Sequence, residues 1–222
     1  MAAGTDEKRV AGRWLRRRGV VLPTWRSVVA GLVVLGVAGW WLATTVHPWL
    51  CVSEAVPGAR YAAVEGWAPD YVLAAAGESA EEGGVKVLYT TGLPLERGGH
   101  LVEFKDYATL AARSLVAMGY EAGRIAPVPS EAVATERTRA MAEALRAALV
   151  LEKAGEGERT INVFTLGTHA RRSRRIYQEV LGPEWRGGVV SVPNRAYEAG
   201  AWYRSSEGVK NVLGEVSALV VQ

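Results

Sequence analysis

The sequence predicts an α/β protein in which a parallel sheet of about five strands carries helices on both faces, with one transmembrane helix before it. Apolar, β-branched runs alternate with longer helix-like segments over residues 60–222, which is typical of βαβ units with right-handed crossovers. The run TINVFTL at 160–166 has the composition of a strand buried on both faces. Residues 27–53 contain no Asp, Glu, Lys or Arg, so a helix there has no charged face to turn toward water.

Residues 27–46 are predicted to form the transmembrane helix, because about 20 apolar residues are enough to cross a bilayer. Trp40, Trp41 and Trp49 lie toward its far end, where interfacial aromatic side chains are expected. A cleaved signal peptide is the main alternative, since a basic segment precedes the apolar run. The run is longer than a typical signal core and no small-x-small cleavage site follows it, so we expect an uncleaved anchor.

The charge distribution predicts the orientation of this helix. Residues 1–26 hold seven Lys or Arg against Asp6 and Glu7, a net charge of +5, which leaves −2 of the total +3 for the rest of the chain. By the positive-inside rule, residues 1–26 form a basic cytoplasmic arm of a single-pass plasma-membrane protein whose C-terminal domain is extracytoplasmic. The pI of about 9.1 then reflects an arm facing membrane lipid and does not indicate a nucleic-acid binder. Residues 47–59 are expected to be a juxtamembrane linker.

The domain at residues 60–222 is predicted from five strand and helix pairs. Pro69 suits the first turn of the first helix, and Gly119 suits the end of the second. Residues 93–101 form a connection that is longer and more Gly-rich than the others, of the kind that serves as a mobile lid. The predicted strands are 60–65, 85–90, 124–128, 160–166 and 188–192, and the predicted helices are 69–82, 103–118, 133–151, 168–181 and 207–220.

The turn after residues 160–166 is the strongest candidate for a binding site. Thr168 suits the N-cap of the next helix, and basic side chains crowd into its first two turns. A helix N-terminus already carries partial positive charge, so this placement is unfavourable unless a phosphate or carboxylate lies there. His169 and Arg172, three residues apart, share one face and can meet the same ligand. Arg174 and Arg175 are expected to be solvated.

Further candidates follow from strand order. If the first and fourth strands are neighbours, their carboxyl ends form a switch-point crevice. We then expect His169 and Glu65 to be catalytic, with Glu65 serving alternatively as a helix cap. Trp67 either stacks on a ligand ring or packs in the fold, and Thr91 and Gly92 suggest a backbone anion site. The expected ligand-binding residues are Gly66, Trp67, Asp70, Thr91, Gly92, Thr168 and Arg172.

Several familiar sites are missing from the sequence. The three histidines form no close-spaced pair of metal ligands, so no metal site is predicted. The nucleophile elbow GxSxG, the P-loop and the dinucleotide fingerprint are also absent. The sequence therefore names no cofactor.

The motif order resembles the YdcF/SanA/ElyC family of bacterial envelope proteins. The resemblance covers roughly residues 61–220, and its most specific part is Thr165 with His169 and Arg172. The first turn reads Glu-Gly-Trp where many members have glycines, so the chain looks like a divergent branch, and Ala140-Met141 stands where many have Glu-Asn. The other matching segments are 64–67, Thr91-Gly92, 136–138, and 202–208 followed by Glu215. The resemblance implies a Rossmann-like, often membrane-anchored domain linked to peptidoglycan precursors and envelope integrity; a soluble relative is associated with S-adenosylmethionine.

These observations together predict a membrane-anchored domain that binds an anionic cell-envelope metabolite, such as a phosphorylated lipid-linked or sugar precursor. His169 would be a general acid or a donor to phosphate, Arg172 a charge clamp, and Glu65 a base or hydroxyl ligand. Whether the ligand is also transformed stays open. One alternative is a nucleotide or S-adenosylmethionine binding module with Trp67 stacked on adenine. The other is a non-catalytic scaffold that docks an envelope protein through the loop at residues 93–101.

Overall fold

The computed structural model describes residues 24–152 and 159–221 and divides the chain into two compact units, Met1–Trp41 and Leu42–Gln222. Helix α1 (Trp25–Leu50) begins in the first unit, and its last turns belong to the second. Most of the basic arm expected at residues 1–26 lies outside the described residues.

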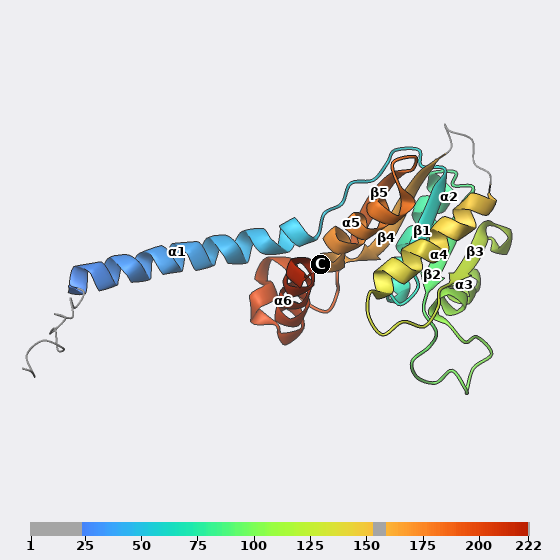
Figure 1. Ribbon diagram of the computed structural model, residues 1–222. Coiled ribbons are helices and arrows are strands. Elements are labelled where there is room, and N and C mark those ends of the chain that lie inside the picture. The colour runs from blue at the N-terminus through green and yellow to red at the C-terminus, as the bar shows by residue number, and fades with distance from the viewer. Residues whose placement is uncertain (1–23, 153–158, 222) are drawn as a thin grey trace, which may run out of the picture. The chain divides into compact units, whose positions relative to one another are not determined.

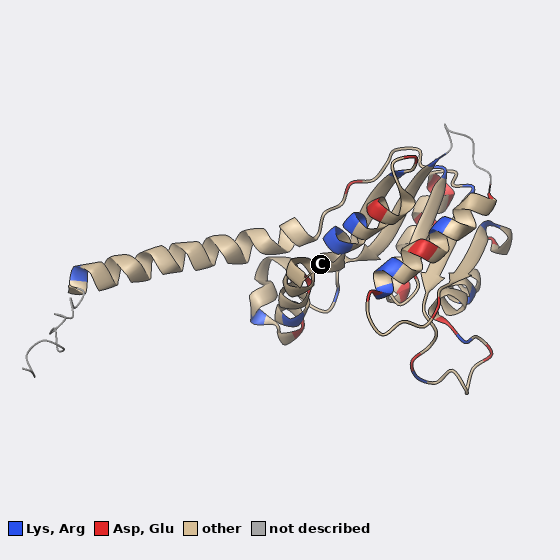
Figure 2. Ribbon diagram, viewed as in Figure 1, with Lys and Arg blue, Asp and Glu red and all other residues tan. Residues whose placement is uncertain are grey.

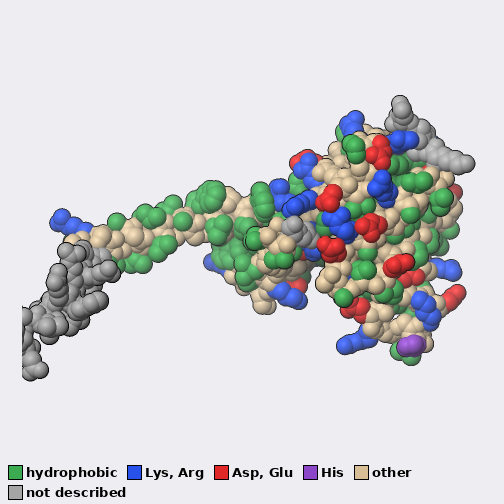
Figure 3. Space-filling view, viewed as in Figure 1, with side chains coloured by type: hydrophobic (Ala, Val, Ile, Leu, Met, Phe, Trp, Pro, Cys, Tyr) green, Lys and Arg blue, Asp and Glu red, His purple; other side chains and the backbone are tan. Residues whose placement is uncertain are grey.

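Helix α1 is long and apolar enough to cross a membrane, as the sequence predicts. Figure 3 shows hydrophobic and uncharged side chains along it, with basic side chains only at its start. The helix continues through Pro48 to Leu50, four residues beyond the predicted segment. The reason is tertiary packing, because Leu50 is fully buried with Trp202 and Val212, and the indole Nε1 of Trp202 donates to the Ala43 carbonyl at 2.7 Å.

The sheet has five parallel strands in the order β3-β2-β1-β4-β5, which confirms the predicted fold class. Strands β1 and β4 are direct neighbours, with Tyr61 opposite Ile161. From this pair β2 and β3 are added on one side of the sheet and β5 on the other, so β1 and β4 form the topological switch point. The carboxyl ends of β1 and β4 therefore form the expected crevice. The strands are β1 (Tyr61–Glu65), β2 (Val87–Gly92), β3 (Ile125–Pro129), β4 (Thr160–Leu166) and β5 (Arg186–Val192).

Helices cover both faces of the sheet (Figure 1). Alternate side chains of β1 point to opposite faces: Tyr61 and Ala63 pack with α4 and α5, whereas Ala62 and Val64 pack with α2 and α3. Glu65 lies on the same face of β1 as Tyr61 and Ala63, so its side chain is directed toward α5. The helices are α2 (Asp70–Glu82), α3 (Tyr107–Ala117), α4 (Arg137–Leu151), α5 (Ala170–Leu181) and α6 (Ser206–Val221).

Two helices begin four residues later than their sequence patterns predict. Helix α3 begins at Tyr107 instead of residue 103, because Asp106 caps it by accepting a hydrogen bond from the Thr109 N–H at 2.7 Å. Helix α4 begins at Arg137 instead of residue 133, directly after Glu136, whose φ of 54° is left-handed. Both delays lengthen the connections at the carboxyl edge of the sheet.

Glycines allow the start of α3 to approach the ends of β1 and β2. A Cβ atom at Gly66 would lie 2.5 Å from the Tyr107 carbonyl oxygen, and one at Gly92 would overlap the Ala108 nitrogen. The Gly66 N–H also donates to the Thr91 carbonyl at 2.7 Å, which ties the two strand ends together. Gly66 and Gly92 therefore serve close backbone packing at the base of the crevice.

We predict that Gly92→Ala destabilises the full chain by about 1–3 kcal/mol, the usual cost of overpacking a well-packed site. Chemical unfolding in detergent, followed by circular dichroism, measures this. Gly187→Ala in β5 is the matched control, because a Cβ atom there meets nothing within 4 Å. Equal stability of the two variants would contradict the close approach.

Candidate functional site

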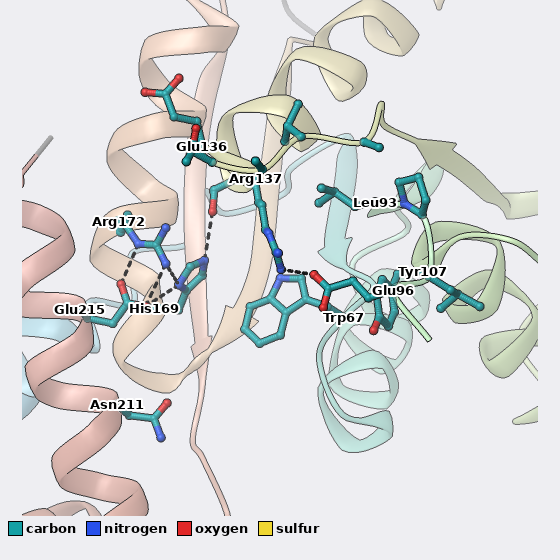
Figure 4. Close-up of a pocket in the computed structure, with 17 residues that line it drawn as sticks. Trp67, Leu93, Glu96, Tyr107, Glu136, Arg137, His169, Arg172, Asn211 and Glu215 are labelled. Carbon is teal, nitrogen blue, oxygen red and sulfur yellow. Dashed lines mark hydrogen bonds and ion pairs between the residues drawn. The ribbon is translucent and has the colours of Figure 1, made fainter. Parts of the chain in front are cut away.

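A cavity of about 770 Å³ lies at the carboxyl edge of the sheet (Figure 4). Trp67 follows β1, residues 93–96 follow β2, and His169 follows β4, so the cavity occupies the predicted switch point. Helix α6 closes one side with Asn211 and Glu215. The remaining lining residues are Tyr107, residues 132–138 and Arg172.

Glu215 joins α6 to the start of α5. Arg172 donates to it through Nε at 2.8 Å and through Nη2 at 3.0 Å, which is a bidentate ion pair. The Nδ1 atom of His169 lies 2.9 Å from Glu215 Oε1 and also 2.9 Å from Arg172 Nη2. Since a guanidinium can only donate and a carboxylate can only accept, Nδ1 accepts from Arg172 in one imidazole tautomer and donates to Glu215 in the other. This arrangement leaves Nε2 of His169 for other partners.

The Nε2 atom of His169 lies between two buried side chains. It lies 3.4 Å from the Thr138 hydroxyl, which also lines the cavity, and 3.6 Å from Glu65 Oε2. The Trp67 ring meets the imidazole edge-on, with ring centroids 5.2 Å apart. His169 is 8% exposed, so its orientation is fixed from several sides. His169 thus lines the cavity as a residue, while its Nε2 atom contacts the buried groups of Thr138 and Glu65.

Glu65 lies behind His169 and does not line the cavity. Its carboxylate is fully buried and accepts hydrogen bonds from Thr165 at 2.5 Å and Ser173 at 2.8 Å. Burial and the nearby Glu65 charge both raise the pKa of Tyr177 well above its usual range, so this phenol stays protonated. The Tyr177 hydroxyl lies 3.3 Å from the Thr91 hydroxyl, which extends the polar network beneath the cavity.

The charged residues of the cavity compensate one another. Burial alone would raise the pKa of Glu215, but hydrogen bonds from His169 and Arg172 outweigh it and lower that pKa to about 2. On the opposite wall, Arg137 forms an ion pair with Glu96 at 2.5 Å, which connects α4 to residues 93–106. The negative charge that the basic turn requires is therefore supplied by the protein's own Glu215.

The structure brings three of the predicted site residues to the cavity and places the others elsewhere. Trp67, His169 and Arg172 line it. Asp70 is exposed at the start of α2, and Thr168 is buried in a 3-10 turn, Gly167–His169. The predicted N-cap role of Thr168 is wrong, because α5 begins at Ala170 without a side-chain cap. The predicted residues outside the cavity lining are Glu65, Gly66, Asp70, Thr91, Gly92 and Thr168.

Sequence reasoning did not select Glu215, Thr138, Arg137 or Asn211 as site residues. Glu215 and Thr138 appear only within the segments that carry the family resemblance. Glu215 is 46 residues from His169, and no local pattern shows which side of α6 faces α5. Within residues 24–152 and 159–221, no group of three His, Cys, Asp or Glu side chains is arranged to hold a metal ion.

Comparison with known proteins gives no relative. A scan against models of known protein families finds no match, and searches of curated proteins and of solved structures find none either. The site therefore has to be interpreted from its own geometry.

We predict that acid weakens the fold through Glu215. Its pKa lies at about 2 in the folded protein against an ordinary value of 4.5. The stabilisation is complete above pH 4.5 and is lost as the pH falls toward 2. At about 1.4 kcal/mol per pKa unit, the loss is on the order of 3 kcal/mol. Urea unfolding of the full chain between these pH values measures it.

The variant Glu215→Gln should remove most of this pH dependence and should be less stable than the unaltered protein at neutral pH. Glu143→Gln, on the exposed face of α4, is the matched control and should retain the pH dependence. An unchanged acid profile in Glu215→Gln would show that its ion pair does not stabilise the fold.

Proposed function

We propose that this chain is a single-pass membrane protein whose extracytoplasmic domain binds an anionic cell-envelope metabolite, a phosphorylated lipid-linked or sugar precursor, in the 770 Å³ cavity. Its role would lie in envelope or peptidoglycan biogenesis. The observation that carries the proposal is that His169, held by Glu215, lines a cavity at the switch point of the sheet together with Arg172 and Trp67. The resemblance to the YdcF/SanA/ElyC family supports the same assignment.

Two arginines can bind the anionic group. Glu215 engages Nε and Nη2 of Arg172, and Glu96 engages Nη1 of Arg137. A guanidinium carries five N–H donors, so each arginine keeps further donors for a phosphate oxygen. Glu215 fixes the largely buried guanidinium of Arg172 in place, which reduces the side-chain entropy that a ligand would have to restrict, whereas the Arg137–Glu96 pair is exposed to solvent.

The other part of the cavity is apolar. Trp67, Leu93, Pro94, Tyr107 and Val133 contribute to its wall, and a volume of about 770 Å³ suits a small organic ligand. An aromatic wall beside paired charges fits a ligand with both a ring or lipid portion and an anion. In this arrangement His169 donates or accepts a proton at the ligand, and Glu215 keeps the imidazole oriented.

Trp67 also favours a second candidate function. Its ring is 37% exposed and lines the cavity, so it offers a surface on which an adenine can stack. A nucleotide or S-adenosylmethionine binding module would use the same cavity. Because these cofactors are cytoplasmic, the location of the domain separates the two candidates.

We predict that the full chain in detergent is stabilised by one class of anionic ligand in a thermal-shift screen. The screen compares nucleotide sugars, polyprenyl phosphates, inorganic phosphate and S-adenosylmethionine. A ligand present at 100 times its dissociation constant stabilises the folded protein by about 2.7 kcal/mol. Trp67→Ala and His169→Gln should abolish the shift, because they remove the aromatic wall and the imidazole.

The control for that screen is His100→Gln, an exposed histidine between β2 and α3, which should leave the shift intact. A shift that survives both cavity variants would place the ligand elsewhere. Failure of every ligand to stabilise the protein would reject the binding proposal and favour a scaffold that docks through the loop at residues 93–101.

We also predict that alkaline phosphatase fused after Gln222 is active in living bacteria, because this enzyme needs disulfides that form outside the cytoplasm. The same reporter fused directly before Trp25 is the matched control and should be inactive. The reverse pattern would place the domain in the cytoplasm and would favour the nucleotide or S-adenosylmethionine candidate.

A further inference from the structure

The C-terminal helix exposes an apolar face that carries no charge. Leu213, Val220 and Val221 are 58%, 81% and 87% exposed. Gly214 and Ser217 lie between them at helical spacing on the same side. After Lys210, the one charged side chain of α6 is Glu215, which is held by His169 and Arg172. An exposed apolar face of this kind marks an interaction surface.

This helix is packed against the last turns of α1, within the second unit. Leu50, Trp202 and Val212 form a buried cluster there, with Val46 and Leu219 packed against it. A helix rises about 1.5 Å per residue, so a membrane segment ending at residue 46 ends about 6 Å from Leu50. If α1 crosses a bilayer, the surface of that bilayer therefore lies close to α6.

Three arginines of α5 lie beside the same turn of α1. In Figure 2 the first turns of α5 carry basic side chains, next to the end of α1. The Arg171 guanidinium stacks 4.1 Å from the centroid of the Trp49 ring, and its Nε donates to the Trp49 carbonyl at 2.5 Å. Arg174 pairs with Glu54 at 2.6 Å. Within the described part of the chain, the exposed Arg175 forms no ion pair.

The arginines and α6 share a hollow of about 380 Å³, which is lined by Trp49, Arg171, Arg174, Arg175, Gln178 and Leu219. The lining of this hollow carries three positive charges, of which Arg174 is paired with Glu54; Arg175 and Val221 also border a second hollow that contains Glu136, Arg139 and Glu179. The size and charge of the first hollow suit a phosphate-bearing headgroup, since guanidinium groups bind phosphate through paired hydrogen bonds. Trp49, which is half exposed, is of the residue type that prefers the headgroup level of a membrane.

We propose that Leu213, Val220 and Val221, together with Arg171, Arg174 and Arg175, bind the surface of an anionic phospholipid bilayer, on the side where α1 leaves it. The apolar side chains enter the boundary between headgroups and acyl chains, and the arginines bind lipid phosphates. A bilayer is the occupant because the face is continuous with the end of an apolar helix and is bordered by positive charge. The proposal rests on α1 crossing the membrane.

Binding of α6 to the membrane also bears on the cavity. The same helix presents Leu213 and Val220 to lipid and Glu215 to His169. A helix seated on the bilayer would hold Glu215 in a fixed position, which suits a site whose ligand carries a lipid chain. This consequence depends on the proposed ligand, whereas the membrane contact does not.

The test uses the full chain with Cys51→Ser, so that a single cysteine introduced at Val220 can carry a fluorophore. The protein is reconstituted into nanodiscs of phosphatidylcholine, with or without phosphatidylglycerol, that contain a nitroxide-labelled lipid as quencher. A label at Leu101, 88% exposed in the loop between β2 and α3, is the matched control. We expect several-fold stronger quenching at Val220 than at Leu101, with a further increase when phosphatidylglycerol is present.

The charge contribution is tested with Arg175→Gln, which should reduce the increase caused by phosphatidylglycerol, because Arg171 and Arg174 remain. Arg113→Gln, on the exposed side of α3, should not. Equal quenching at Val220 and Leu101 would overturn the proposal. Quenching at Val220 that changes neither when phosphatidylglycerol is added nor when Arg175 is replaced would also overturn it. Protection of the Val220 label in detergent, together with the mass of two chains, would assign the face to a second copy and would also overturn it. None of these measurements involves the cavity ligand.

Discussion

The carboxylate of Glu215 is the contact on which the candidate site depends. The sequence places His169 and four arginines at a helix start that already carries partial positive charge. The Glu215 carboxylate compensates this positive charge, because it lies 2.8 to 3.0 Å from Arg172 and 2.9 Å from His169. Because the chain supplies its own anion, the basic turn alone is not evidence for a bound phosphate. A ligand site is supported instead by the cavity, by His169 in its lining and by the remaining donors of Arg172 and Arg137.

His169 lies between two carboxylates of different kinds. Glu215 is partly accessible and shared with an arginine, whereas Glu65 is fully buried and satisfied by the hydroxyl groups of Thr165 and Ser173. A buried carboxylate without such donors would be strongly destabilising, so these two hydroxyls are what permit its position. Glu65 then reaches the site only through His169, with Oε2 3.6 Å from Nε2, and it does not line the cavity. This arrangement fixes the imidazole in one orientation, which proton transfer requires.

The elements were largely predictable because their signals are local. All five strands begin and end within two residues of their predicted positions, since apolar runs and glycine breaks lie within each segment. The pairing of β1 with β4 is only a condition at the sequence level, because right-handed crossovers do not fix the order of strands; the structure shows the pairing and places Trp67 beside His169. What could not be predicted depends on side-chain direction or on distant packing. Side chains alternate between the two faces of β1, and this alternation directs Glu65 toward α5. The orientation of α6 about its own axis places Glu215, rather than Glu207, against His169.

The end of α1 illustrates the same limit and bears on how the domain folds. Residues 47–59 look like a linker from their prolines and glycine, yet Leu50 is fully buried and Trp202 hydrogen-bonds to the Ala43 carbonyl. Removing residues 42–50 would expose Trp202 and Val212 and would remove the apolar side chains of Val46 and Leu50 against which α6 packs. Since α6 carries Glu215, the orientation of His169 depends on the last turns of a helix whose sequence indicates only a membrane anchor. The last turns of α1, from Leu42 onward, and the candidate site are therefore parts of one folded unit.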